Sequence, residues 1–329
     1  MSFSSSRRRL VTAAACALVA TGAASGALAQ QDFPNRSIRI IVPFTAGGSS
    51  DVQGRMLAER LTRLYKQPVV VENRPGAGGH IGGKLVVDAP ADGYTLMLGS
   101  IGLHATYGVY KKLPYNPATD FKVLTVVAEM PHVIVATPSL PAGNVKELVA
   151  LARKQHGSLN FGSAGVGSSV HMIGELFKVT ADAPMTHVPY KGSAAALNDL
   201  LGGQIQLMFE NPPTTLAHIR GGKLKALAVT GKTRIAALPD VPTVAESGLP
   251  GFEATSWTTI AVSAKVPDAI ADRLSADIRK IIQSHEFVEA LAAQGMTPVA
   301  SSREAATKFL AAEKQRWDRV IQKADLVAD

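Results

Sequence analysis

Residues 38–55, IRIIVPFTAGGSSDVQGR, constrain the fold more than any other part of this sequence. A run of β-branched residues at 38–42 is typical of a short buried strand. Pro43 ends that run, and a turn of small residues follows at 45–50. Apolar residues then recur at helical spacing, which predicts a strand, a glycine turn and a helix. Free N–H groups at the start of such a helix, together with its dipole, favour an anion without any basic side chain.

The same pattern recurs later in the chain. Residues 159–161 predict a short strand, 162–169 (GSAGVGSS) a small-residue turn, and 170–177 an amphipathic helix. Similar units at 67–87 and 186–201 predict an α/β fold with mostly parallel sheets flanked by helices. Ligands of open α/β sheets bind at the carboxyl ends of the strands, so two such lobes facing each other would form a cleft.

Length and composition limit the functions that this chain can have. The 329 residues are enough for two domains, and 46% apolar content is enough for ordinary cores. The net charge is +8, but the basic residues are scattered and not interleaved with aromatic ones, so we expect no nucleic-acid partner. The histidines form no H-x-x-x-H pair, and residues 78–85 resemble a phosphate-binding loop but have Leu85 where Ser or Thr is needed. We therefore expect no metal and no cofactor.

Residues 1–29 have the three parts of a secretory signal peptide. Arginines at 7–9 form the basic region, 10–20 the apolar region, and Ala27-Leu28-Ala29 the cleavage site before Gln30. The apolar run is too short to span a membrane comfortably. The only cysteine, Cys16, lies in this segment, so the predicted mature protein has no thiol for a disulfide, a metal or catalysis.

The serines of the second glycine turn allow an alternative interpretation as a hydrolase. Ser163 and Ser168 lie near His171 in the sequence, but the turn is not G-x-S-x-G, and no buried acid is evident that would orient the imidazole. Helix capping is the simpler role for these hydroxyls, and they are also credible as ligand contacts.

Other polar residues have more than one interpretation. Asp51 and Arg55 are spaced to pair along a helix, which predicts a structural role for Asp51. Glu210 and Asn211 end a predicted strand, so they either line the cleft or lie in a loop. Trp257 either forms a wall of the cleft or packs between the lobes.

Six stretches carry a resemblance to a known family, in order along nearly the whole chain: 43–55, 71–79, 92–96, 162–168, 187–192 and 238–243. Together they resemble the periplasmic solute receptors of tripartite tricarboxylate transporters, also called the Bug family. The resemblance implies a type II-like periplasmic binding protein. Its first lobe would comprise residues 31–128 plus 254–329 and its second lobe 129–253, joined by two crossover strands near 130–137 and 255–263.

The resemblance further implies a monomeric, non-enzymatic receptor. It would hold a small carboxylate (a di- or tricarboxylate, an amino acid or an aromatic acid) by backbone N–H groups, small hydroxyls and water. It would deliver this ligand to integral-membrane permease subunits; presentation to a membrane sensor kinase is the alternative, and a serine hydrolase is a third. The chain departs from the family at Glu210-Asn211, where members often carry an aspartate or another polar pair. The predicted ligand-binding residues are Phe44, Ala46, Gly47, Gly48, Ser49, Ala77, Gly78, Ser100, Ser163, Ala164, Gly165, Gly167, Ser168, Tyr190, Glu210 and Asn211.

Overall fold

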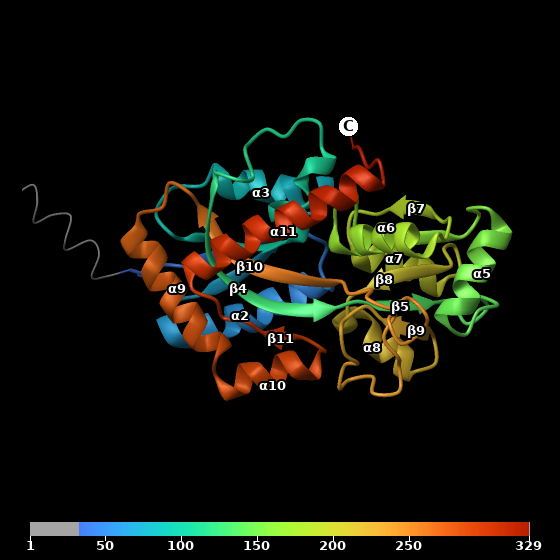
Figure 1. Ribbon diagram of the computed structural model, residues 1–329. Coiled ribbons are helices and arrows are strands. Elements are labelled where there is room, and N and C mark those ends of the chain that lie inside the picture. Colours follow the sequence, from blue (N-terminus) through green and yellow to red (C-terminus); the bar gives the residue numbers. More distant parts are fainter. Residues whose placement is uncertain (1–32, 329) are drawn as a thin grey trace, which may run out of the picture.

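Two β-sheets, each covered by helices, form two lobes that lie side by side (Figure 1). The computed structural model describes residues 33–328, and the predicted signal peptide lies outside this range. We call the part built on the six-stranded sheet the first lobe and the part built on the five-stranded sheet the second lobe. The predicted two-lobed α/β fold is confirmed.

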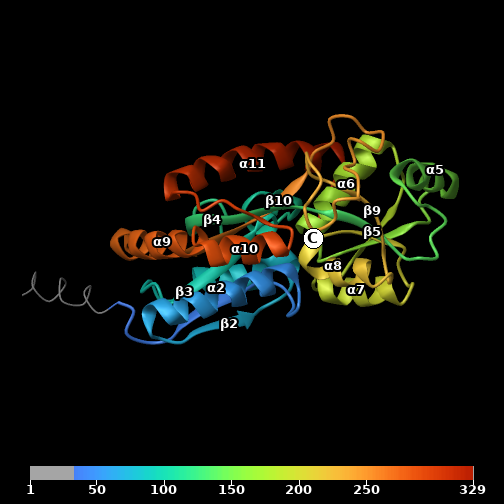
Figure 2. The same ribbon diagram turned by 90° about the horizontal axis from the view of Figure 1, so that it is seen from below.

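The first lobe has the strand order β11-β4-β10-β3-β1-β2. Its strands are β1 (Ile38–Val42), β2 (Val69–Asn73), β3 (Thr95–Ser100), β4 (Phe121–Pro131), β10 (Thr255–Ser263) and β11 (Thr297–Pro298). Its helices are α2 (Ser49–Tyr65), α3 (His80–Val87), α4 (Ile101–His104), α9 (Asp268–Ile282), α10 (His285–Ala293) and α11 (Arg303–Lys323), with short 3-10 turns η1 (Ala77–Gly79) and η2 (Tyr107–Val109). Helix α11 packs on β4 and reaches α6 of the second lobe (Figures 1 and 2).

The second lobe has the order β7-β6-β8-β5-β9. Its strands are β5 (Val133–Ala136), β6 (Asn160–Ser163), β7 (Thr186–Pro189), β8 (Leu207–Glu210) and β9 (Lys225–Val229), and its helices are α5 (Val145–Gln155), α6 (Ser169–Ala181), α7 (Ser193–Leu201) and α8 (Pro212–Arg220). Helix α8 was not expected from the sequence. Its two leading prolines suit a helix start, where the missing N–H has no intrahelical partner to lose.

Both sheets are mixed, which corrects the expectation of mostly parallel sheets. Strand β1 is parallel to β2 and β3, but β10 is antiparallel to β3 and β4. In the second lobe, β6 is parallel to β7 and β8, and β5 is antiparallel to β8 and β9. The physical reason is the connection between the lobes: β4 leads out of the first lobe and β10 returns to it, so the two strands pair in opposite directions.

The chain crosses between the lobes at two neighbouring points. Strand β4 ends at Pro131 and β5 begins at Val133, with only His132 between them. On the way back, Ala254 N–H donates to Thr230 in the second lobe at 2.8 Å, and β10 begins at the next residue. The division into residues 31–128 plus 254–329 and 129–253 stays a prediction, and its first boundary falls within β4.

Helix α2 shows how sequence spacing positions the first glycine turn. Leu57 and Leu61 are one turn apart and fully buried in the core between the sheet and α9. Full burial of one such side chain stabilises the fold by about 1.5–3 kcal/mol. The N-terminus of α2 is thereby held at the carboxyl end of β1.

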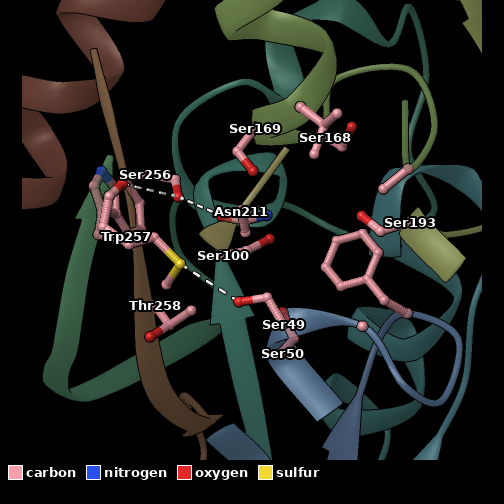
Figure 3. A pocket seen from close by; sticks show the side chains of 15 residues that line it. Ser49, Ser50, Ser100, Ser168, Ser169, Ser193, Asn211, Ser256, Trp257 and Thr258 are labelled. Atoms are coloured by element: carbon pink, nitrogen blue, oxygen red, sulfur yellow. Dashed lines mark hydrogen bonds between the residues drawn. The ribbon is translucent and has the colours of Figure 1, made fainter. Parts of the chain in front are cut away.

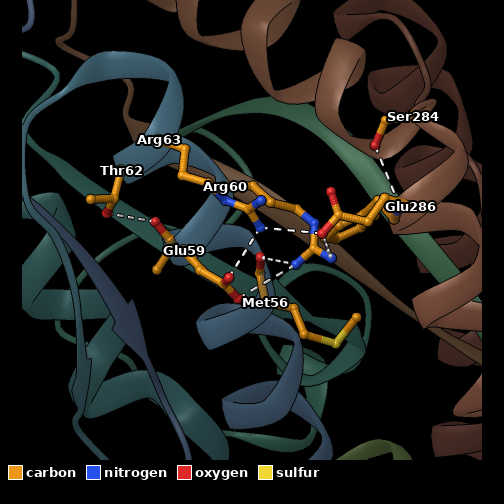
Figure 4. A network of polar contacts seen from close by, with 9 residues as sticks. Met56, Glu59, Arg60, Thr62, Arg63, Ser284 and Glu286 are labelled. Atoms are coloured by element: carbon orange, nitrogen blue, oxygen red, sulfur yellow. Dashed lines mark hydrogen bonds and ion pairs between the residues drawn. The ribbon is translucent and has the colours of Figure 1, made fainter.

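The outer face of α2 carries a polar network with α10 (Figure 4). Arg60 and Arg63 both bond Glu286 Oε1, at 2.9 and 3.2 Å, and Arg63 also bonds Glu59 at 3.0 Å. Because Glu286 is 59% exposed, each pair contributes only about 0–1 kcal/mol. The network orients α10 on α2 more than it stabilises the fold.

Candidate functional site

A small cavity lies between the lobes, where strands of both sheets end (Figure 3). Its free space is about 30 Å³, which holds about two water molecules. The lining residues are Phe44, Gly48, Ser49, Ser50, Ser100, Met130, Ala164, Ser168, Ser169, Val170, Ser193, Asn211, Ser256, Trp257 and Thr258. None of these side chains carries a charge.

Four helices of at least nine residues begin at this cavity. Helix α2 begins at Ser49, α6 at Ser169 and α7 at Ser193, and Asn211 is the N-cap of α8. Each helix N-terminus carries about half a positive charge on its unpaired N–H groups. Because α2 belongs to the first lobe and the others to the second, the two lobes together create a positive potential in a cavity without a basic side chain.

Several hydroxyl groups of the wall are available to a ligand. Ser100 Oγ is buried and has no hydrogen-bond partner. Ser49 Oγ contacts only Met130 Sδ, at 3.4 Å, which is a weak acceptor. Thr258 Oγ1 donates to Gln53 Oε1 at 2.7 Å. The buried Nε2 at the other end of this amide has no hydrogen-bond partner. An acceptor-rich ligand would satisfy the hydroxyl donors of Ser49 and Ser100.

The first glycine turn does not offer all the N–H donors expected of it. Gly47 N–H donates to Asp51 Oδ2 at 2.9 Å, and the same carboxylate accepts Arg55 Nε at 3.0 Å. The predicted pair of Asp51 and Arg55 is therefore confirmed. Burial raises the pKa of Asp51, but bonds from Arg55, Gly47 and Asn73 outweigh this and hold it below its usual value.

The second glycine turn is also bonded internally. Gly165 N–H donates to Ser163 Oγ and Gly167 N–H to His171 Nδ1, both at 3.1 Å. The positive φ angles of the two glycines, 119° and 76°, let the turn fold back on its own strand and helix. Side chains of the same lobe accept from both N–H groups, and ligand binding at these two glycines stays a prediction.

The predicted ligand-binding residues separate into three groups. Seven line the cavity: Phe44, Gly48, Ser49, Ser100, Ala164, Ser168 and Asn211. Ala164 also borders a groove between the lobes, together with Ala77, Gly78, Gly165 and Tyr190. Ala46 and Gly47 are exposed, and Ser163, Gly167 and Glu210 are buried but line neither space. Ligand binding by any of these residues stays a prediction.

Several lining residues were not among the predicted ligand contacts. Ser193 follows Gly192 at the start of α7, and this glycine–serine step was a usable signal. Ser256 and Thr258 lie in β10, where nothing local distinguishes them from other strand residues. Both roles considered for Trp257 apply: it borders the cavity, and it is buried in a hydrophobic cluster that contains residues of both lobes, such as Ile101 and Phe161.

A histidine lies beside Ser163, which the sequence analysis did not anticipate. His187 Nε2 is 2.6 Å from Ser163 Oγ, and the His187 ring stacks on His171 at 3.9 Å between centroids. Ser163 is nevertheless fully buried and does not line the cavity between the lobes, so its oxygen is not accessible when the lobes are closed. Burial lowers the pKa of His171 to about 2 and that of His187 to about 4, so both rings are neutral. Ser163 and the two histidines thus support the second glycine turn.

The described residues contain no group of three or more His, Cys, Asp or Glu side chains that is arranged to hold a metal. Two α/β lobes joined by two crossing strands, with an uncharged polar cavity between them, are the architecture of the two-lobed solute-binding proteins. The chain belongs to a particular family of this class. Residues 54–326 match the family described as tripartite tricarboxylate transporter family receptor, TctC.

Known relatives agree with this assignment. The chain is 38% identical to Protein BugT of Bordetella pertussis over 306 residues, which are 92% of this chain and 94% of BugT. It is also similar to Rpa4515 of R. palustris with adipate (37% identity, TM-score 0.88, covering 90% and 99% of the two chains). MatC of Rhodopseudomonas palustris with bound malate is 29% identical, with a TM-score of 0.83 over 88% and 100%. A TctC solute-binding protein from Polaromonas without ligand is 30% identical, with a TM-score of 0.62 over 88% and 99%.

Proposed function

We propose that this protein captures a small organic acid, most simply a dicarboxylate, in the cavity between its lobes. The observation that carries the proposal is the convergence of four helix N-termini from both lobes on a cavity whose side chains are uncharged. Such a site favours a negative charge. The relatives that contain adipate and malate support a carboxylate as the ligand class.

We infer that the ligand closes the two lobes. A dicarboxylate is larger than a cavity of about 30 Å³, so the lobes must part before it enters. Tyr110 and Thr106 of the first lobe donate to the carbonyls of Val166 and Gly167 in the second, and these bonds form only when the lobes meet. The malate-bound relative and the unliganded relative have nearly the same sequence identity to this chain, 29% and 30%, but the malate-bound one superposes on it better, with a TM-score of 0.83 against 0.62. This supports a difference between the two relatives in how their lobes are arranged. The ligand shifts the equilibrium through its higher affinity for the closed form.

Thermal unfolding with adipate, malate and other small acids tests the ligand class. An acid at about a hundred times its dissociation constant should stabilise the protein by about 2.7 kcal/mol, and X-ray scattering should show compaction at the same concentrations. The methyl ester or amide of the same acid is the matched control and should do neither. Equal binding of the neutral analogue would contradict the carboxylate, whereas binding without compaction would contradict only closure.

We also propose that the receptor acts in the periplasm and delivers its ligand to the permease subunits of a tripartite tricarboxylate transporter. The family's description and the signal-peptide pattern in residues 1–29 support this. Mass spectrometry of the secreted protein should find an N-terminus at or near Gln30. A protein that retains the arginines at 7–9 would count against export.

A further inference from the structure

A buried chain of hydrogen-bonding groups runs from the crossing point of the lobes to the cavity. His132, between β4 and β5, has its Nδ1 at 2.7 Å from Phe209 O and its Nε2 at 2.9 Å from Ser256 Oγ. Ser256 Oγ lies 3.2 Å from Asn211 Oδ1, and Asn211 Nδ2 lies 3.1 Å from Glu210 Oε1. The two ends of an amide have nearly the same shape, so its hydrogen-bond partners decide which end is oxygen. His132 and Glu210 are fully buried, and Asn211 and Ser256 line the cavity.

His132 determines where the protons lie along this series of hydrogen-bonded groups. The carbonyl of Phe209 has no proton to give, so His132 Nδ1 must carry one. The groups that bond the ring are uncharged: Phe209 O on β8 and Ser256 on β10. The backbone N–H of His132 donates to the hydroxyl of Thr230, which is also uncharged. A second proton would place an unpaired imidazolium in a fully buried site, which is costly. The ring is therefore neutral, and its Nε2 must accept the hydroxyl proton of Ser256.

Ser256 has only that one proton to donate. Its contact with Met130 O is 3.5 Å long and too weak to compete. With its proton committed to His132, Ser256 Oγ must accept from Asn211, which requires the amide NH₂ on the Ser256 side. The opposite orientation, with the amide oxygen toward Ser256, would require His132 to be an imidazolium. The proton count therefore turns the amide over, so that its oxygen takes the place of Nδ2 at 3.1 Å from Glu210 Oε1. Two oxygens at that distance need a proton between them.

We propose that Glu210 is a neutral carboxylic acid in the closed protein and that it turns the amide NH₂ of Asn211 toward the cavity. The groups that face Glu210 are also uncharged: Ser193 on α7, Asn211 and Thr214 on α8, and Val133 opposite it on β5. Glu210 Oε2 has no hydrogen bond of normal geometry. Burial raises the pKa of Glu210, and the backbone N–H of Asn211, which donates to Oε1 at 2.8 Å, offsets only part of that rise.

This orientation of Asn211 restricts the class of ligand that the cavity would bind, and the restriction rests on the proposed function. One N–H of Asn211 bonds Ser256, and the other is free for the ligand. Glu210 thus acts as a positioning residue that makes this part of the wall a donor. The wall then suits a carboxylate, hydroxyl or carbonyl oxygen of the ligand and disfavours an ammonium group, which is itself a donor. We therefore expect acids without an amino group to bind better than amino acids of the same skeleton.

Infrared difference spectroscopy tests the proton on Glu210 without any ligand. At neutral pH, the wild-type protein should show a neutral carboxylic-acid carbonyl band that is absent from Glu210→Gln. The matched control is Glu175→Gln, which removes a buried carboxyl that bonds Lys178 at 2.9 Å and should leave the band unchanged. A band of equal intensity in Glu210→Gln and the wild type would overturn the proposal.

Binding of succinate, malate and aspartate tests the donor at Asn211, because these acids differ only in bearing hydrogen, hydroxyl or ammonium at one carbon. The wild type should bind aspartate the weakest. Asn211→Asp, which removes the NH₂, should lower succinate affinity about tenfold or more and reduce the discrimination against aspartate. Preferred binding of aspartate by the wild type would contradict the inference. If none of the acids binds but the band is present, only the proposed function fails; if they bind and the band is absent, only the Glu210 inference fails.

Discussion

Thr45 of the first lobe packs against Gly192 of the second so closely that a Cβ atom on Gly192 would lie 2.1 Å from Thr45 Oγ1. The φ angle of Gly192 is 166°, an extended value that any residue adopts. The neighbouring lobe, and not the backbone, therefore requires glycine here. The contact marks a point where closure leaves no room for a side chain.

Gly192→Ala should hold the lobes apart. We expect the affinity for the ligand to fall about tenfold, since overpacking a tight contact costs about 1–3 kcal/mol. The melting temperature without ligand should change little, because the open form relieves the clash. Gly143→Ala is the matched control: it is exposed in the second lobe, and its new Cβ would lie 3.5 Å from Glu147. Unchanged affinity in Gly192→Ala would show that this contact does not limit closure.

Tyr110→Phe should weaken closure by removing one bond between the lobes, from the hydroxyl to Val166 O at 2.9 Å. A neutral hydrogen bond contributes about 0.5–1.5 kcal/mol, so the dissociation constant should rise about two- to tenfold. Calorimetric titration measures it. The control is Tyr65→Phe, whose hydroxyl bonds Asp277 within the first lobe at 3.0 Å. That variant should lose stability and keep affinity; the reverse pattern would argue against a latch at Tyr110.

Ser168→Ala should affect both stability and binding. Ser168 Oγ caps α6 by accepting His171 N–H at 3.3 Å, and the residue also lines the cavity. Loss of the cap should lower the free energy of unfolding by about 1 kcal/mol, and loss of a bond to a charged ligand should lower affinity by about 1.5–3 kcal/mol. Ser302→Ala removes the cap of α11, far from the cavity, and should affect stability only. Equal affinity changes in the two variants would contradict a ligand contact at Ser168.

Acid should destabilise the protein partly through His171. Burial lowers its folded-state pKa to about 2, whereas an unfolded histidine titrates near 6.5. Below about pH 6.5 the unfolded state binds a proton that the folded state does not, so the free energy of unfolding falls as pH falls, by about 1.4 kcal/mol per pH unit for this group. Urea unfolding between pH 7 and 5 should show a shallower pH dependence in His171→Asn. The same change at His285, which is 87% exposed, should leave the dependence as in the wild type.

Local patterns in the sequence determined most of the elements. The strand at 38–42 and the helix that follows were predictable because apolar spacing and small-residue turns act between near neighbours. The crossover strand expected near 255–263 has those bounds in the structure. Recurrence of the strand, turn and helix unit was enough to predict two α/β lobes with a ligand site at the strand ends.

Tertiary structure alone decided which groups meet at the site. His132 and Ser256 are 124 residues apart in the chain, and Asn211 and Ser256 are 45 apart, so no local pattern relates them. The sequence also could not indicate that Asp51 takes the N–H of Gly47, because that bond depends on how the turn folds back onto its helix. The site arises from contacts that form only when separate strand ends and helix starts are packed together, whereas helices and strands arise from the spacing of residues along the chain.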